Sequence, residues 1–172
     1  MKRTVTFVFV AIALATSVMA QGAAPGPLEG VWKVAEEVVT GADASSTTSP
    51  QPSLFIFTRT HYSMLRVASP QPRALFKAMD PTSEEKIATF DTFTANSGTY
   101  EVAGTTLTVR PIVAKNPNFM AGGSDKYQFR VDGNTLWLTS KSTDLNIRVG
   151  DRVVPVSPGT VSETRRKLIR VE

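Results

Sequence analysis

Apolar and polar residues alternate over short stretches through most of residues 28–172, and turn-forming residues separate these stretches. A period of two is typical of strands with one buried face. In the clearest stretch, Tyr127, Phe129 and Val131 share one face, and Asp132-Gly133 supplies the positive φ angles of a tight hairpin. The pattern predicts eight strands, at residues 30–39, 53–58, 61–67, 97–102, 105–113, 126–131, 134–140 and 164–171, and allows a further hairpin at 145–156 that would bring the number to ten.

One segment follows a helical period instead. Thr82 and Glu85 are placed as in a capping box, in which each side chain binds the other residue's backbone N–H group. Ile87, Phe90 and Phe93 then recur at helical spacing. The segment predicts one short helix over residues 82–93, whose apolar stripe packs on the sheet.

Two connections stand out by their length. Residues 41–52 are polar and turn-rich, which predicts a surface loop. Residues 68–80 are interrupted by proline but carry Leu75, Phe76 and Met79. This second connection is either a lid over a binding site or an ordered segment that packs its apolar residues on the sheet.

The strand pattern predicts an all-β domain. Antiparallel strands leave two exposed edges unless the sheet closes on itself, and short turns favour an up-and-down order. We therefore expect an eight-stranded up-and-down antiparallel β-barrel, with a two-sheet sandwich as the alternative. An eight-stranded barrel is wide enough to be filled by side chains or to hold one small ligand.

The N-terminus has the layout of a secretory signal peptide. Lys2 and Arg3 precede an apolar run at 4–15, and Val18-Met19-Ala20 has the small residues of a cleavage site. The run is shorter than the ~20 residues of a membrane-spanning helix, which disfavours an uncleaved anchor. We expect cleavage after Ala20, a secreted or periplasmic protein without a stable membrane anchor, a flexible lead-in at 21–27 and one domain at 28–172.

Charge and composition exclude several classes. The chain has 19 basic and 15 acidic residues, and removal of Lys2 and Arg3 leaves a small positive balance, so no nucleic-acid partner is expected. There is no cysteine, hence no disulfide, lipid-modified cysteine or cysteine nucleophile. His61 is the single histidine, and an exposed residue at a strand end is the simple interpretation of it. We predict no catalytic residues, no metal site and no cofactor.

Arginines are the more informative polar residues. Arg59, Arg66, Arg110 and Arg130 lie on or beside predicted strands. An arginine inside a barrel could bind a carboxylate with two parallel hydrogen bonds. Arg66 and Arg110 are the best candidates for an acidic ligand, and the alternative is that these arginines face solvent.

Four motifs resemble one family in their order along the chain. They are Leu28-Glu29-Gly30-Val31-Trp32, the passage from Pro81-Thr82-Ser83-Glu84-Glu85 to Ser97-Gly98-Thr99-Tyr100-Glu101-Val102, Asn116-Pro117-Asn118-Phe119, and Leu168-Ile169-Arg170-Val171. Together they resemble the bacterial lipocalin-like domain, a calycin-type barrel. The resemblance implies a small barrel that binds small molecules in its interior or mouth. Relatives often carry histidines before the Asn-Pro loop, where this chain has Val109-Arg110-Pro111-Ile112, so histidine-dependent chemistry is not expected here.

The resemblance also implies how the barrel closes. In lipocalins an arginine of the last strand stacks on the tryptophan of the Gly-x-Trp motif, which corresponds here to Arg170 on Trp32, and Gly30 leaves room for the close approach. The alternative is that Trp32 is ordinary core and Arg170 a solvated terminal charge.

The leading hypothesis is an exported lipocalin-like barrel that binds a small amphipathic or hydrophobic molecule and is not an enzyme. The alternatives are a barrel-type isomerase or cyclase and an envelope interaction protein with a filled barrel. A cavity of ~300 Å³ or more would favour the binding protein. A carboxylate with a perturbed pKa in a cleft would favour the enzyme. The sequence leaves the oligomeric state open. The residues expected to contact a ligand are Tyr62, Met64, Arg66, Tyr100, Arg110, Phe119, Tyr127, Phe129 and Trp137.

Overall fold

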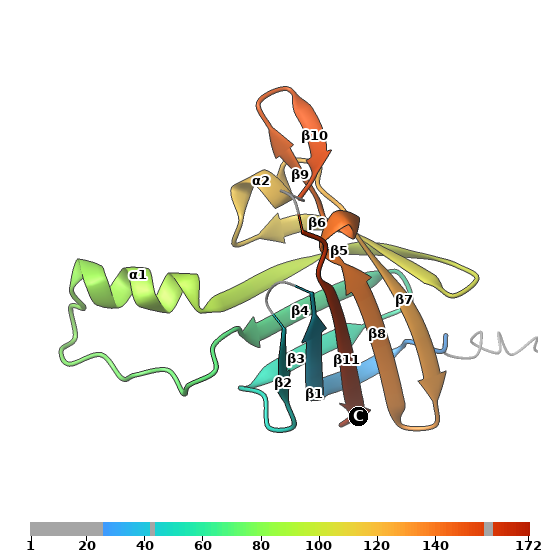
Figure 1. The fold of residues 1–172 in the computed structure, drawn as a ribbon, viewed down its shortest axis with the longest axis horizontal. Helices are drawn as coiled ribbons and strands as arrows, with labels where there is room; N and C mark the ends of the chain where they lie inside the picture. The colour runs from blue at the N-terminus through green and yellow to red at the C-terminus, as the bar shows by residue number, and fades with distance from the viewer. Residues whose placement is uncertain (1–25, 42–43, 157–159) are drawn as a thin grey trace, which may run out of the picture.

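Eight antiparallel strands form a closed ring in the computed structural model, which describes residues 26–41, 44–156 and 160–172 (Figure 1). Each strand pairs with its neighbours in the order below, and β11 pairs back to β1. The predicted all-β barrel is therefore confirmed, and the sandwich alternative is wrong. The ring consists of β1 (Gly30–Thr40), β3 (Ser53–Phe57), β4 (His61–Val67), β5 (Phe93–Ala103), β6 (Thr106–Ala114), β7 (Asp125–Asp132), β8 (Thr135–Lys141) and β11 (Glu163–Arg170).

Six smaller elements of the described residues lie outside the ring. They are β2 (Ser45–Thr47), α1 (Ser83–Asp91), α2 (Pro117–Met120), the short 3-10 helix η1 (Ser142–Asp144) and the hairpin of β9 (Asn146–Val149) with β10 (Arg152–Pro155). The hairpin confirms the strand pair that the sequence allowed at 145–156. The predicted surface loop at 41–52 contains β2, which pairs with residues 37–39 of β1. The predicted signal peptide at 1–20 and most of the predicted lead-in lie outside the described residues.

Two tight turns set the register of the barrel hairpins. Gly104 and Gly133 have φ angles of +60° and +55°, a region that glycine enters without steric strain. They join β5 to β6 and β7 to β8, as the sequence predicts. β5 differs from its prediction, because it begins at Phe93 and not at residue 97.

The hydrophobic core fills one end of the barrel. Trp32, Leu107, Leu136, Leu138 and Leu168 have no accessible surface. These residues lie near the start of β1, β6 and β8 and near the end of β11, and antiparallel pairing brings those strand ends together. The opposite end, where β4, β6 and β8 finish, is the mouth of the barrel.

The closing strands meet around Trp32 at the packed end. The guanidinium carbon of Arg170 lies 4.0 Å from the centroid of the Trp32 ring, and Arg170 Nη1 donates to the carbonyl of Glu29 at 2.5 Å. The Trp32 indole N–H group donates to the carbonyl of Leu28 at 2.9 Å. Gly30 has a φ angle of +137°, and a Cβ there would lie 2.1 Å from Arg170 Nη1. The predicted stacking is confirmed, and it leaves no room for a side chain at position 30.

Helix α1 departs from its predicted place. The capping box is present and the helix ends at Asp91, but Ile87 is 60% and Phe90 55% exposed, so the predicted packing on the barrel is wrong. Because β5 begins two residues after α1 ends, the helix continues beyond the mouth of the barrel and does not fold back on the sheet (Figure 1). Phe93 belongs to β5.

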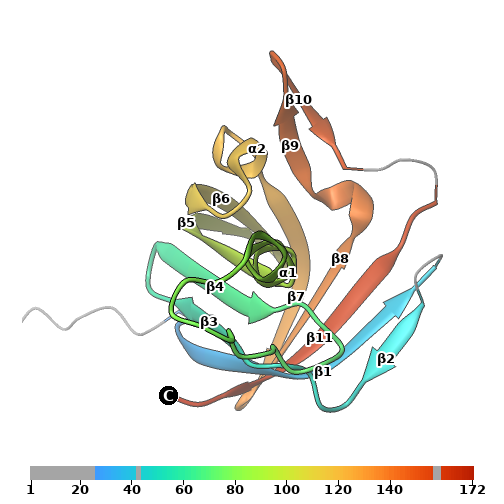
Figure 2. The ribbon, with the colours of Figure 1, turned by 90° about the vertical axis from the view of Figure 1, so that its left-hand side faces the viewer.

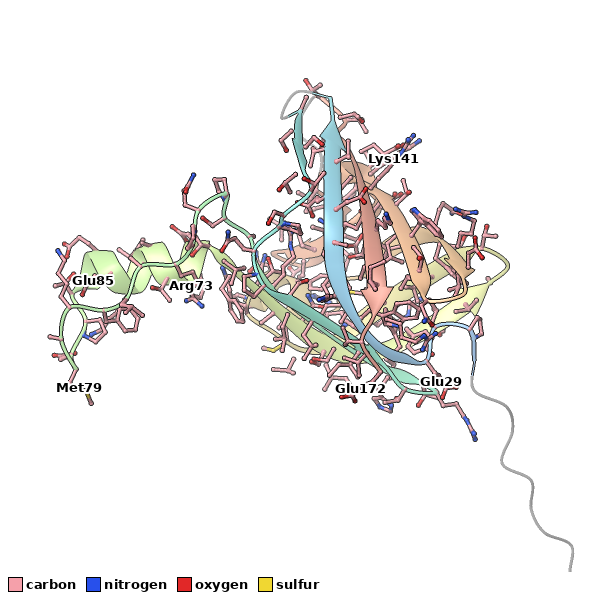
Figure 3. All side chains as sticks on the ribbon, turned by 90° about the horizontal axis from the view of Figure 1, so that it is seen from below. Glu29, Arg73, Met79, Glu85, Lys141 and Glu172 are labelled. Carbon is pink, nitrogen blue, oxygen red and sulfur yellow. The ribbon has the colours of Figure 1, made fainter. Side chains whose placement is uncertain are left out.

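The connection before α1 projects with it. Leu75 is 92% exposed, Met79 is fully exposed and Phe76 is half-exposed. Figure 3 places Met79 at the far tip, well away from the barrel. In this conformation Leu75, Phe76 and Met79 neither line the mouth cavity nor pack on the barrel. Residues 68–92 are called the arm below.

Arg170→Met should lower the free energy of unfolding by about 2–3 kcal/mol, because it removes both the stacking on Trp32 and a charged hydrogen bond. Urea denaturation measures the change. Arg165→Met on the same strand is the matched control, since Arg165 is exposed and pairs with Glu163. Equal small effects of the two substitutions would show that closure does not depend on Arg170.

Phe90→Ala should change the free energy of unfolding by less than about 1 kcal/mol, because its ring is exposed on the arm. Phe57→Ala should cost about 3–5 kcal/mol, because Phe57 is only 2% exposed. Thermal and urea unfolding of both variants decide the matter. A large loss for Phe90→Ala would mean that the arm packs on the barrel in solution.

Candidate functional site

A cavity of about 480 Å³ opens at the mouth of the barrel. Figure 2 looks toward this end, with α1 seen end-on in front of it. The wall combines the last residues of β4, β6 and β8 with the first residues of β5, β7 and β11. Its large apolar side chains are Phe55, Met64, Phe93, Phe119, Leu145 and Ile147.

The Asn-Pro loop builds one side of this wall. Asn116 caps α2 by accepting a hydrogen bond from the backbone of Asn118, and Pro117 occupies the first turn, where no N–H group is needed. This short helix buries Phe119. Gly123 packs so closely that a Cβ would lie 2.6 Å from the Phe119 ring. The loop therefore fixes an aromatic side chain at the edge of the cavity.

Three charged side chains form a cluster between β1, β4 and β11. Glu37 Oε2 accepts from Arg66 Nη1 at 2.6 Å and from Arg166 Nε at 2.5 Å. Burial lowers the pKa of Arg66, and so does the charge of Arg166, while Glu37 acts in the opposite direction. Two guanidinium groups thus share one carboxylate in a partly desolvated place. We call these three residues the arginine cluster.

A second polar group lies on β7. The Tyr127 hydroxyl donates to Asp125 Oδ2. Burial raises the pKa of Asp125 to about 6, although the hydrogen bonds from Tyr127 and from the Lys126 backbone and the charge of Arg166 lower it. The pKa of Tyr127 is raised well above its usual value, first by burial and then by Asp125.

Three buried polar atoms have no hydrogen-bond partner among the described residues: Asp125 Oδ1, Asn96 Oδ1 and the Tyr62 hydroxyl. Asp125 and Asn96 both line the cavity. Buried polar groups are normally satisfied, so such atoms indicate a place for ordered water or a ligand group. The mouth thus contrasts with the fully packed opposite end.

The predicted ligand contacts divide into three groups. Met64, Arg66, Phe119 and Tyr127 line the cavity. Tyr62 lies in the core and Phe129 packs against it. Three residues lie away from the cavity: Tyr100 packs edge-on against Phe57 and donates to the Thr58 carbonyl, Arg110 is exposed 3.9 Å from Glu101, and Trp137 stacks with Arg130 on the outer surface.

The sequence prediction of the site missed Glu37, Asn96, Asp125 and Arg166. Strand alternation holds enough signal for two of them. Asp125 lies two residues before the inward Tyr127, and Arg166 lies two residues before the inward Leu168. His61 is exposed at the start of β4 and its Nδ1 lies 2.9 Å from the Thr60 hydroxyl.

The fold and the cavity define a small barrel with one open, partly polar end. The model of the lipocalin-like domain family matches residues 29–154, and the chain belongs to this family. A lipocalin-like protein from Bacteroides uniformis is similar in structure at 12% sequence identity and a TM-score of 0.41, over 84% of this chain and 99% of that one. A comparison with curated proteins gave no match. In the described part of the chain no helix is long and apolar enough to cross a membrane.

Asp125 should make the folded state more stable as the pH falls. Its pKa is about 6 in the folded chain against 3.8 for the unperturbed group, so the folded state binds the proton more tightly. The stabilisation is lost as the pH rises through 6. At pH 7.5 the variant Asp125→Asn should be more stable than the native chain, because it removes a buried ionised group. We expect this difference in the free energy of unfolding to shrink by about 2 kcal/mol between pH 7.5 and 4.5.

Urea denaturation at the two pH values measures this difference. Asp151→Asn, in the exposed turn of the β9–β10 hairpin, is the control and should show no such dependence. An advantage of Asp125→Asn that does not vary with pH would contradict the raised pKa.

Proposed function

We propose that this chain is an exported barrel that binds a small amphipathic molecule in the cavity at its mouth. The observation that carries the proposal is the cavity itself, because about 480 Å³ exceeds the ~300 Å³ at which ligand pockets begin. Its wall has the two parts that an amphipathic molecule needs. Met64, Phe119 and Ile147 can contact an apolar body, and Arg66 and Arg166 can contact a polar group.

An interaction protein with a filled barrel is disfavoured by the same cavity. An isomerase is the second candidate, because a carboxylate with a raised pKa in a cleft is a feature of general acids and bases. Against it, Asp125 Oδ2 is engaged by Tyr127 and Oδ1 is buried. A proton acceptor must reach the substrate, so we favour binding.

Export is the second part of the proposal. It is supported by the positive residues, apolar run and cleavage pattern of the first 20 residues. Secretion or release into a periplasm would follow cleavage after Ala20. A binding protein in such a compartment would meet its ligand outside the cytoplasm.

One preparation tests both parts. The protein is purified from the exported fraction of its own host without denaturation. Intact mass should show a chain that begins at Gln21, and the native mass should show an additional small molecule. A chain that begins at Met1 would contradict the export proposal, and a native mass without an adduct would count against bound ligand.

Ala114→Phe should abolish the adduct, because Ala114 lines the cavity and a phenyl ring would occupy it. Ala103→Phe is the matched control on the same sheet, since Ala103 is exposed near the β5–β6 turn at the packed end. An adduct retained by Ala114→Phe would place the ligand elsewhere.

A further inference from the structure

We propose that the ligand headgroup carries a single negative charge and that Arg66 and Arg166 bind it. This inference rests on the proposed function, because it names the chemical class of the molecule that would occupy the mouth cavity.

The arginine cluster carries one positive charge in excess. Glu37 uses a single oxygen, Oε2, to accept from both guanidinium groups. The side chains of Arg66 and Arg166 are only 25% and 13% exposed, so water screens their mutual repulsion weakly. Burial lowers the pKa of Arg66, and the charge of Arg166 lowers it further. A second carboxylate-like group would neutralise the cluster.

The same two residues have donors to spare. A guanidinium group has five N–H donors in a planar fork. Among the described residues, each of the two arginines makes one side-chain hydrogen bond, and both of these bonds go to Glu37. Both arginines line the cavity, so their remaining N–H groups are available to an anion that enters it. A planar carboxylate, or another small anionic group, matches this arrangement.

The other charged side chains around the cavity also favour an anionic headgroup. Lys115 and Lys141 add two cations, while Asp91 and Asp125 are the acidic side chains that line the cavity. Burial raises the pKa of Asp125 to about 6, so at pH 7.5 it is ionised and counts with Asp91 and Glu37 against Arg66, Arg166, Lys115 and Lys141. Cations therefore outnumber anions around the cavity, and a cationic headgroup would meet the excess charge of the arginine cluster.

The matched probes are decanoate, decanol and decylamine, which share an apolar chain and differ in headgroup charge. Calorimetric titration of the mature chain, freed of ligand by refolding, compares their dissociation constants at pH 7.5. Decanoate should bind about 10- to 100-fold more tightly than decanol, as expected for hydrogen bonds to a charged group. Decylamine should bind more weakly than decanol.

Arg166→Gln leaves one arginine opposite Glu37 and removes the excess charge. It should weaken the binding of decanoate at least about tenfold and leave the affinity for decanol unchanged. The unchanged affinity for decanol shows that the variant is folded. Glu37→Gln should have the opposite effect and strengthen the binding of decanoate. Arg165→Gln, one residue away on the outer face of β11, is the matched control and should change neither affinity.

Equal affinity for decanoate and decanol, together with no loss in Arg166→Gln, would overturn the anionic headgroup and leave the binding function standing. Tighter binding of decylamine than of decanoate would also overturn it, because the preferred headgroup would then be cationic. If none of the three probes binds the native chain, the proposed function fails with the inference. A loss of affinity for decanoate in Arg166→Gln, with the affinity for decanol retained, supports the proposal even if Glu37→Gln does not fold.

Discussion

The pairing of β1 with β11 is the constraint on which the rest of the structure depends. Without it the sheet would present two open edges, and the eight strands could flatten or pair with other chains. The stacked pair of Trp32 and Arg170 holds the two strands at the packed end, and Gly30 allows the contact. Farther along the same two strands, Glu37 on β1 lies opposite Arg166 on β11. The seam of the barrel therefore supplies both its closure and part of its candidate site.

Stability and function lie at opposite ends of the barrel. Each fully buried side chain of the packed end contributes about 1.5–3 kcal/mol through removal from water. A partly buried ion cluster adds little net stability, because desolvation of its charges offsets their attraction. The same holds for Asp125, whose ionised form is penalised by burial. The mouth can carry unsatisfied polar atoms and an excess charge because the core at the other end does not depend on it.

The arm shows a limit of local reasoning. Its capping box and helical spacing predict a helix, and the helix is present at Ser83–Asp91. The spacing of Ile87 and Phe90 also suggests a packed face, but packing requires a partner surface within reach. The next strand begins at Phe93 and carries the helix past the end of the barrel, so those side chains remain exposed. A chain segment can thus have the right conformation and a different environment.

The sequence by itself determined the eight strands of the ring (though not the start of β5), the hairpin turns, the helix cap and the residues of the closure, because these depend on period-two alternation, glycine backbone freedom and family motifs. It also placed Met64, Arg66, Phe119 and Tyr127 among the candidate contacts. Only the tertiary structure decided which charges meet. Trp32 and Val34 point inward, so strict alternation would next turn Glu36 inward, but a bulge after Val34 shifts the phase. Glu37 therefore joins the two arginines, while Glu36 binds Lys167. An inserted residue changes which face every later side chain occupies, and local sequence does not reveal where strand pairing will accept it.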